Sequence, residues 1–265
     1  MKRIRLEARS IAKRFGRVAA LRGVDFEIDP GESVAILGAN GAGKSTLLRI
    51  LAGLARVTEG EFQGSCVDDD ATPLSRQALR SVVGYVGHAT LLYGELTAAE
   101  NLRFAGRLAG IDPARDAIQE LLEEFDLQDV ADRRTGTFSR GMSQRLAIAR
   151  AIIHRPPVLL LDEPFTGLDE VSSQRLSAEL GRLRGGGRTL VVVTHDPRRA
   201  TELADRALLL HRGEIVARPR RDGSANPSLE ALPAGANDDD AVPFTVDALR
   251  DRLVGLAGGG AEIVR

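Results

Sequence analysis

The pattern of hydrophobic and polar positions predicts an α/β fold in which strands and helices alternate. Mostly apolar runs, typical of buried strands, lie at 33–37, 81–87, 158–161 and 189–194. Shorter or alternating runs, typical of strands with a solvated face, lie at 4–8, 20–28, 59–64, 207–211 and 214–216. Apolar residues at helical spacing predict helices at 46–53, 97–109, 112–125, 143–153 and 171–183.

Capping and turn residues divide this pattern further. Thr97 and Glu100 form a capping box at the start of one helix. The spacing stays helical from 88 to about 153, which predicts a helical subdomain inserted between strands. The polar segment 67–73 contains an acidic triplet, and we expect a solvated loop there rather than a metal site.

The composition changes near the end of the chain. Pro, Gly, Asp and Ala dominate from about 218 to 242, which is typical of a linker. Residues 245–256 can form a short amphipathic helix that ends at the glycines 258–260. We therefore expect one domain at 1–217 and a tail at 218–265, made of a linker and a short helix.

Composition and charge exclude several classes of protein. The chain has 265 residues and a formal net charge of −1, so no overall field attracts it to nucleic acid or anionic lipid. Its single cysteine, Cys66, excludes an internal disulfide and fits a reducing compartment. No apolar run approaches the roughly 20 residues of a membrane helix, and residues 1–6 lack an apolar signal core. We expect a cytosolic protein that reaches a membrane only through a partner.

One stretch fits the phosphate-binding loop G-x-x-x-x-G-K-[ST], between an expected strand and an expected helix. It consists of Gly38, Ala39, Asn40, Gly41, Ala42, Gly43, Lys44, Ser45 and Thr46. The glycines let successive N–H groups point at phosphate oxygens, and the start of the helix adds partial positive charge. We expect Lys44 to reach the β- and γ-phosphates and Ser45 to bind Mg²⁺. The alternative is a plain glycine-rich turn, which this context disfavours.

Two carboxylates follow a later buried strand. The apolar run 158–161 leads directly into Asp162 and Glu163. Asp162 is expected to lie within reach of the Mg²⁺ on Ser45, and Glu163 to act as the base that polarises a water for attack on the γ-phosphate. An apolar strand that ends in acids is common, but downstream of a phosphate loop it indicates nucleotide hydrolysis.

With these residues the chain resembles the ATP-binding-cassette (ABC) ATPases, the nucleotide-binding subunits of membrane transporters. The resemblance covers about 4–216. Residues 138–145 resemble the signature motif, residues 167–169 the D-loop, and His195 the switch histidine, in the family's order. The resemblance implies a P-loop NTPase (RecA-like) core of mixed sheet, with an antiparallel β subdomain and an inserted α-helical subdomain.

The resemblance also implies that two copies of the chain enclose two ATP molecules. The residues expected to contact the ATP of the second copy are Ser139, Arg140, Gly141, Met142 and Asp169. Ser139 and Gly141 would begin a helix at Ser143 and present a hydroxyl, N–H groups and a positive helix end to the γ-phosphate.

The same resemblance implies roles for two further residues, His195 and Phe15. His195 would donate a hydrogen bond to the γ-phosphate and hold Glu163 and the attacking water. Phe15 would stack on the adenine. The alternatives are a core histidine for His195 and a core aromatic residue for Phe15.

Three positions depart from the usual family motifs. Arg140 replaces a glycine, Met142 replaces a glutamine, and His88 replaces a glutamine that touches the Mg²⁺ or the attacking water. His88 is therefore a candidate nucleotide contact and metal ligand. The segment 84–106 is most similar to the ATPase of the haem exporter in cytochrome c maturation.

A transport ATPase is the leading hypothesis for the function. The expected cofactors are ATP and Mg²⁺, and the expected partners are a second copy and integral membrane permease subunits, which hold the chain at the cytoplasmic side of the membrane. Export is expected, with haem as the cargo implied by the resemblance. The alternatives are another exporter, of drugs or lipids, and a non-transport cassette protein acting on DNA or ribosomes. A phosphate-loop kinase would lack the signature motif, and no nucleic-acid partner is expected.

Overall fold

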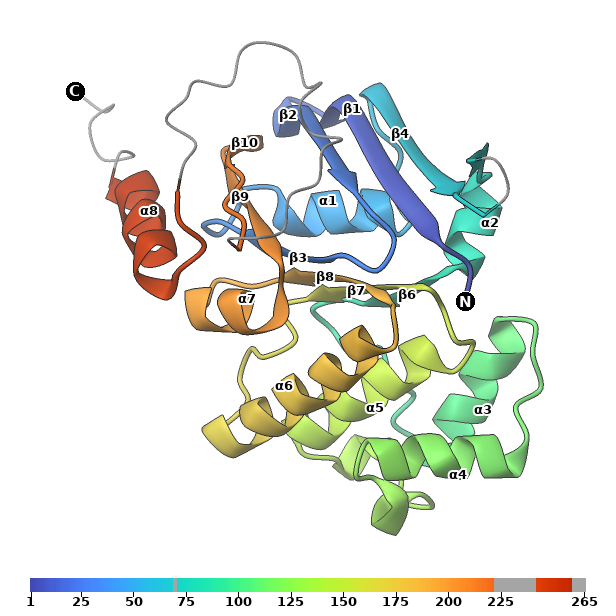
Figure 1. Ribbon diagram of the computed structural model, residues 1–265. Coiled ribbons are helices and arrows are strands. Elements are labelled where there is room, and N and C mark those ends of the chain that lie inside the picture. Colours follow the sequence, from blue (N-terminus) through green and yellow to red (C-terminus); the bar gives the residue numbers. More distant parts are fainter. Residues whose placement is uncertain (69–70, 222–241, 259–265) are drawn as a thin grey trace.

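Two sheets and a group of helices form successive layers of the molecule (Figure 1). The structure, a computed structural model, describes residues 1–68, 71–221 and 242–258. A helix lies between the two sheets, and further helices cover the opposite face of the larger sheet. This arrangement confirms the expected α/β class, with a mixed sheet, an antiparallel sheet and a helical region.

The smaller sheet is antiparallel and has the strand order β2-β1-β4-β5. Its strands are β1 (Ile4–Phe15), β2 (Val18–Ile28), β4 (Glu59–Cys66) and β5 (Thr72–Pro73). The first strand extends well beyond the expected 4–8. Its pairing with β2 shifts register at several points between Ala8 and Arg14. Such bulges interrupt the alternation that marks a strand in the sequence. Part of the expected loop 67–73 pairs as β5, and positions 69–70 lie outside the described residues.

The larger sheet has the order β10-β9-β3-β8-β7-β6 and is parallel except for β10. Its strands are β3 (Ser33–Leu37), β6 (Val83–Val86), β7 (Val158–Asp162), β8 (Thr189–Val193), β9 (Arg206–His211) and β10 (Glu214–Ala217). Every residue of β3, β7 and β8 is buried, as their continuous apolar sequences predict. The carboxyl ends of these three neighbouring strands therefore meet at one edge of the sheet, where the predicted site residues follow them.

Helix α1 (Lys44–Leu51) lies between the two sheets. It begins at Lys44, two residues before the expected start at Thr46. Its buried residues, including Leu47, Leu48 and Leu51, belong to a hydrophobic core that both sheets share. The phosphate-binding loop is therefore held between a buried strand and a buried helix.

A second hydrophobic core lies among the helices on the other face of the larger sheet. The helices between α1 and the tail are α2 (Arg76–Ser81), α3 (Ala98–Leu108), α4 (Arg115–Glu124), α5 (Arg140–Ile152), α6 (Glu170–Gly185) and α7 (Pro197–Leu203), with 3₁₀ turns at Gln128–Val130 and Thr135–Thr137. Helices α2 and α7 are too short to show a helical period, and the sequence pattern missed them. The capping box is present: the Glu100 N–H donates to Oγ1 of Thr97 (3.2 Å), and the Thr97 N–H donates to Oε2 of Glu100 (2.8 Å).

Helix α5 corrects one expectation. It begins at Arg140 and not at Ser143. The reason is that Ser139 is its N-cap, with Oγ accepting a hydrogen bond from the Met142 N–H at 3.2 Å. The signature segment therefore forms the cap and first turn of α5.

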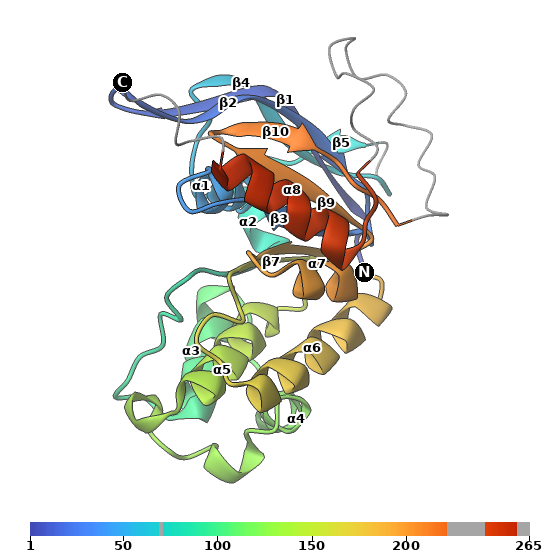
Figure 2. The same cartoon turned by 90° about the vertical axis from the view of Figure 1, so that its left-hand side faces the viewer.

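The described part of the tail packs against the larger sheet and α7. Helix α8 (Val246–Gly258) crosses this side of the molecule (Figure 2). Phe244 and Leu249 are buried in a small core formed with β3, β9 and α7. Residues 218–221 continue beside β9, because the Ala207 N–H donates to the Pro219 carbonyl at 2.9 Å. The rest of the expected linker and the glycines after 258 lie outside the described residues. Across the described ranges, no helix has the length and apolar character needed to cross a bilayer.

Candidate nucleotide-binding site

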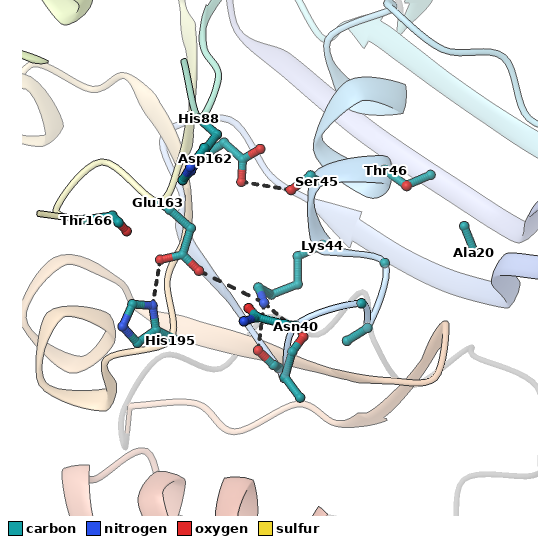
Figure 3. A pocket seen from close by; sticks show the side chains of 15 residues that line it. Ala20, Asn40, Lys44, Ser45, Thr46, His88, Asp162, Glu163, Thr166 and His195 are labelled. Carbon is teal, nitrogen blue, oxygen red and sulfur yellow. Dashed lines mark hydrogen bonds and ion pairs between the residues drawn. The ribbon is translucent and has the colours of Figure 1, made fainter. Parts of the chain in front are cut away.

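A cavity of about 700 Å³ lies at the carboxyl edge of β3, β7 and β8 (Figure 3). The whole phosphate-binding loop, 38–46, lines it. The other lining residues are Ala20, His88, Asp162, Glu163, Thr166 and His195. The structure thus brings together five separate segments of the sequence.

Two glycines allow the loop to pass close to the neighbouring backbone. A Cβ on Gly38 would lie 2.3 Å from the carbonyl oxygen of Leu210. A Cβ on Gly43 would lie 2.5 Å from that of Ala20, and Gly43 has φ +106°. Gly43 caps α1 without a side-chain hydrogen bond, and the first turn contains no acidic residue. The first N–H groups of α1 therefore remain available to an anion.

Lys44 is buried in the centre of the cavity wall. Its Nζ donates to the carbonyl oxygens of Gly38 (2.7 Å) and Ala39 (3.1 Å) and lies 4.0 Å from Oε1 of Glu163. Burial lowers the pKa of Lys44, and the charges of Glu163 and Asp162 oppose this shift. A buried ammonium held by neutral carbonyls is suited to bind phosphate oxygens.

Ser45 and Asp162 provide oxygen ligands for a cation. The Ser45 hydroxyl donates to Oδ1 of Asp162 at 3.2 Å, and Asp162 is only 3% exposed. A hydroxyl and a buried carboxylate suit Mg²⁺, which usually binds one or two protein oxygens together with substrate phosphates. Within the described residues, no three His, Cys, Asp or Glu side chains form a metal cluster by themselves. The residues therefore fit a Mg²⁺ ion that arrives with a nucleotide.

Glu163 is held in an unusual conformation. Its φ is +53°, a left-handed value that is rare for residues other than glycine. Its N–H donates to the Val193 carbonyl at 3.0 Å, and Oε2 lies 2.8 Å from Nδ1 of His195. Backbone strain of this kind is typical of functional sites. Because His195 is exposed at the cavity and contacts Glu163, the core-histidine alternative is excluded.

The other predicted nucleotide contacts do not line this cavity. Phe15 is 55% exposed near the turn that joins β1 to β2, with Nζ of Lys13 at 5.0 Å from its ring centre, so it is not a core residue. Met142 packs against the core of the helical region. Asp169 caps α6 by accepting from the Ser172 N–H at 2.7 Å, and this hydrogen bond lowers its pKa. Sequence reasoning missed two lining residues, Ala20 and Thr166, which belong to no motif.

Comparison with known proteins was made by sequence and by structure. A family model described as "ABC transporter" matches residues 21–166. The chain is 38% identical over 204 residues to the ABC transporter ATP-binding protein NatA of Bacillus subtilis, covering 76% of this chain and 82% of NatA. It is 42% identical to the sulfate/thiosulfate import ATP-binding protein CysA of Methylococcus capsulatus, covering 79% of this chain and 61% of CysA.

Two further similarities concern an import protein and a solved structure. The chain is 37% identical to the maltose/maltodextrin import ATP-binding protein MalK of Yersinia pestis, covering 78% of this chain and 56% of MalK. It thus spans about three fifths of the length of these two import relatives. The dimeric post-hydrolysis state of the ATP-binding cassette MJ0796, bound to ADP and Pi, matches with a TM-score of 0.72 and 31% identity, covering 81% of this chain and 98% of that chain.

Proposed function

The chain belongs to the ABC transporter family of ATP-binding proteins, and from that premise we propose that it hydrolyses ATP to drive a membrane transporter. One observation carries the proposal. The phosphate-binding loop, the Ser45–Asp162 pair and the Glu163–His195 pair all line a single cavity. These are the parts that ATP hydrolysis requires.

Each side chain has a role that its position supports. Lys44 leaves the carbonyls of Gly38 and Ala39 and binds the β- and γ-phosphates. Mg²⁺, held by Ser45 and Asp162, neutralises phosphate charge when it is bound. Glu163 accepts a hydrogen bond from the attacking water, and His195 keeps this carboxylate oriented while it contacts the γ-phosphate. His88, on the same cavity wall, is proposed as a further contact to the water or the metal.

We also propose that the active form contains two copies, each completing the site of the other. Residues 139–142 form the cap and first turn of α5, and Asp169 caps α6. None of them lines the cavity of its own chain. A facing copy can bring them to the γ-phosphate. The solved cassette MJ0796 described as dimeric supports this arrangement.

A groove away from the nucleotide cavity is a candidate docking surface for a membrane subunit. A groove of about 550 Å³ lies between the larger sheet and the helical region, and it contains exposed apolar side chains. They are Leu91, Tyr93, Phe104 and Leu108. Tyr93 and Phe104 pack edge to face with their centres 4.9 Å apart. We propose that a cytoplasmic segment of an integral membrane permease fills this groove and holds the chain at the cytoplasmic side of the membrane.

The direction of transport and the cargo are further proposals. The similarity of 84–106 to the haem-exporter ATPases of cytochrome c maturation, named CcmA, supports export, with haem as the cargo. CysA and MalK are import ATP-binding proteins, and their similarity to this chain makes import the second candidate. The membrane partner distinguishes the two, because cargo contacts lie in that subunit.

Purification of the tagged chain from detergent-solubilised membranes tests the proposal. We expect an integral membrane protein to be recovered with it, and Leu108→Glu to reduce that recovery. Val254→Glu on α8 is the control, since Val254 is similarly exposed (65%, against 72% for Leu108) but distant from the groove. Recovery of ribosomes or DNA without a membrane protein would contradict the proposal.

A further inference from the structure

A cavity of about 610 Å³ lies at the amino ends of β7 and β8, away from the nucleotide cavity at their carboxyl ends. Among the residues that line it, Arg188 directly precedes β8, and His154 and Arg155 lie between α5 and β7. Residues of α4 and α6 line its other sides. The volume is within the range typical of small-molecule sites, and none of the roles proposed above uses this cavity.

Arg188 brings a buried positive charge to this cavity. The residue is only 9% exposed, and its Nε donates to the Pro156 carbonyl at 2.9 Å. Across the described ranges, its two terminal nitrogens make no hydrogen bond and its side chain forms no ion pair, yet both nitrogens keep some accessible surface. Burial lowers the pKa of Arg188, and the charge of Glu124 opposes this shift only in part. A buried guanidinium that uses so few of its donors is costly unless an anion binds it.

Two further arginines, Arg155 and Arg182, line the same cavity. Both are exposed, and in the described part of the chain neither side chain makes a hydrogen bond or an ion pair. Arg182 acts on Glu179 only as a neighbouring charge. Arg155 has φ +52°, a left-handed value that favours glycine, so an arginine stands here in spite of backbone strain. Three guanidiniums therefore border one cavity.

Acidic side chains limit the charge that the cavity can accept. Glu120 and Glu124, both on α4, line it together with the three arginines. Burial and the charge of Arg188 lower the pKa of His154, against a hydrogen bond to the Val83 backbone, so this ring is neutral near pH 7. Three guanidiniums and two carboxylates leave one net positive charge among the lining side chains. A singly charged anion balances it, whereas a phosphate monoester carries about −1.5 to −2 at pH 7.

We propose that this cavity binds a small amphipathic carboxylic acid, with its carboxylate on Arg188 and its hydrocarbon part on the apolar wall. That wall consists of Ile111, Leu121, Ile152, Ile153 and Leu183. A planar guanidinium matches a carboxylate with two parallel hydrogen bonds. The ligand would contact α4 on one side and the start of β8 on the other, and so join the helical region to the larger sheet.

Isothermal titration calorimetry with decanoate, without nucleotide, tests the proposal. We expect one decanoate per chain, and Arg188→Gln should weaken its binding by about 10- to 100-fold, because hydrogen bonds to charged groups are among the stronger ones. Arg115→Gln is the control, since Arg115 is exposed at the start of α4 and does not line the cavity. Wild-type affinity in a folded Arg188→Gln protein would overturn the proposal.

Two variants keep the test independent of the buried Arg188. Arg155→Gln combined with Arg182→Gln changes only exposed positions and should weaken binding at least about fivefold. Ala117→Trp fills the cavity from α4 without changing its charge and should abolish binding, whereas Gln119→Trp, at an exposed position of the same helix outside the cavity, should not. Wild-type affinity in both the double variant and Ala117→Trp would overturn the proposal.

The chemistry of the ligand is tested with two analogues of the same chain length. Decanol lacks the charge and should bind at least about tenfold more weakly than decanoate. Equal binding of the two would show an apolar cavity only and would overturn the carboxylate assignment. Decyl phosphate carries the larger charge and should bind no more tightly than decanoate. Tighter binding of decyl phosphate would overturn the choice of a singly charged ligand.

The Lys44→Ala variant separates this site from the nucleotide cavity. It should bind decanoate as the wild type does, because the two cavities lie at opposite edges of the larger sheet. Displacement of decanoate by ATP, or its loss in Lys44→Ala, would place the ligand in the nucleotide cavity and overturn the proposal. Decanoate binding by a chain that fails to hydrolyse ATP would contradict the proposed function alone and would support this second site.

Discussion

Oε2 of Glu163 lies 2.8 Å from Nδ1 of His195, although 32 positions separate the two residues in the sequence. The contact exists because the strands before them, β7 and β8, are parallel neighbours. The Glu163 side chain is 16% exposed and the His195 side chain 68%. The carboxylate is therefore fixed inside the cavity, while the histidine reaches its mouth, where a nucleotide would arrive.

Glu163→Gln is expected to separate binding from hydrolysis. The amide keeps the size of the side chain but cannot accept a proton, and general bases contribute about 10²- to 10⁴-fold to such rates. The variant should bind ATP as the wild type does and hydrolyse it at least 10²-fold more slowly. Unchanged turnover in a phosphate-release assay would refute the role of Glu163.

Lys44→Ala is expected to lose affinity for ATP by about 10²-fold or more, because the loop would lack its charged donor for the phosphates. Lys44→Arg should also bind poorly, since Lys44 is only 7% exposed and its compact ammonium, which the broad planar guanidinium cannot mimic, is held by the carbonyls of Gly38 and Ala39. Lys2→Ala, at the exposed chain start, is the control. Titration with a fluorescent ATP analogue measures all three, and wild-type affinity in Lys44→Ala would refute the loop assignment.

Glu179 on α6 should make folding stability depend on pH. Burial raises its pKa to about 7; Asp126 and Glu124 add to this shift, and Arg145 and Arg182 oppose it. Its Oε2 has no hydrogen-bond partner among the described residues. In the unfolded chain the carboxyl titrates near 4.5. The folded state therefore binds more protons between these two values, and the free energy of unfolding falls as the pH rises from about 4.5 to about 7.

Glu179→Gln removes this proton linkage. The variant should be more stable than the wild type at pH 8 by roughly 1–3 kcal/mol, and the difference should shrink towards pH 5. Glu120→Gln, on the exposed face of α4, should leave the free energy of unfolding unchanged at both pH 5 and pH 8. Urea unfolding at the two pH values measures the effect, and a constant difference between variant and wild type would contradict it.

The C-terminal helix should contribute to the stability of the whole domain. Leu249 is fully buried against α7 and the larger sheet, whereas Val254 on the same helix is 65% exposed. Leu249→Ala should lower the free energy of unfolding by about 2–4 kcal/mol, through lost burial and a cavity. Val254→Ala should change it by less than about 0.5 kcal/mol. Equal effects of the two substitutions would mean that α8 does not pack as described.

Sequence patterns predicted the parallel core well, because its strands are buried on both faces and read as continuous apolar runs. The same patterns failed where local geometry interrupts a period. Bulges hid the second half of β1, and the short helices α2 and α7 give too few turns to be recognised. The sequence places Ser139 before a helix that begins at Ser143, whereas Ser139 caps α5 directly and the helix begins at Arg140.

Some residues of the candidate site can be predicted from the sequence, and others cannot. Lys44, Ser45, Asp162, Glu163 and His195 follow strands or a motif with fixed spacing, and the fold brings them into one cavity. Ala20 and Thr166 reach the same cavity through folding alone, and no motif marks them. In the two-copy form proposed above, the signature residues belong to the site of the facing copy, and one folded copy does not bring them to its own cavity.

The most direct test of the account is the mass of the Glu163→Gln variant in solution with Mg²⁺ and ATP, measured by sedimentation velocity. The account predicts a dimer with ATP and a monomer with ADP, because only the γ-phosphate joins the loop of one copy to Ser139 of the other. Nucleotide bound tightly to a variant that remains monomeric would contradict it.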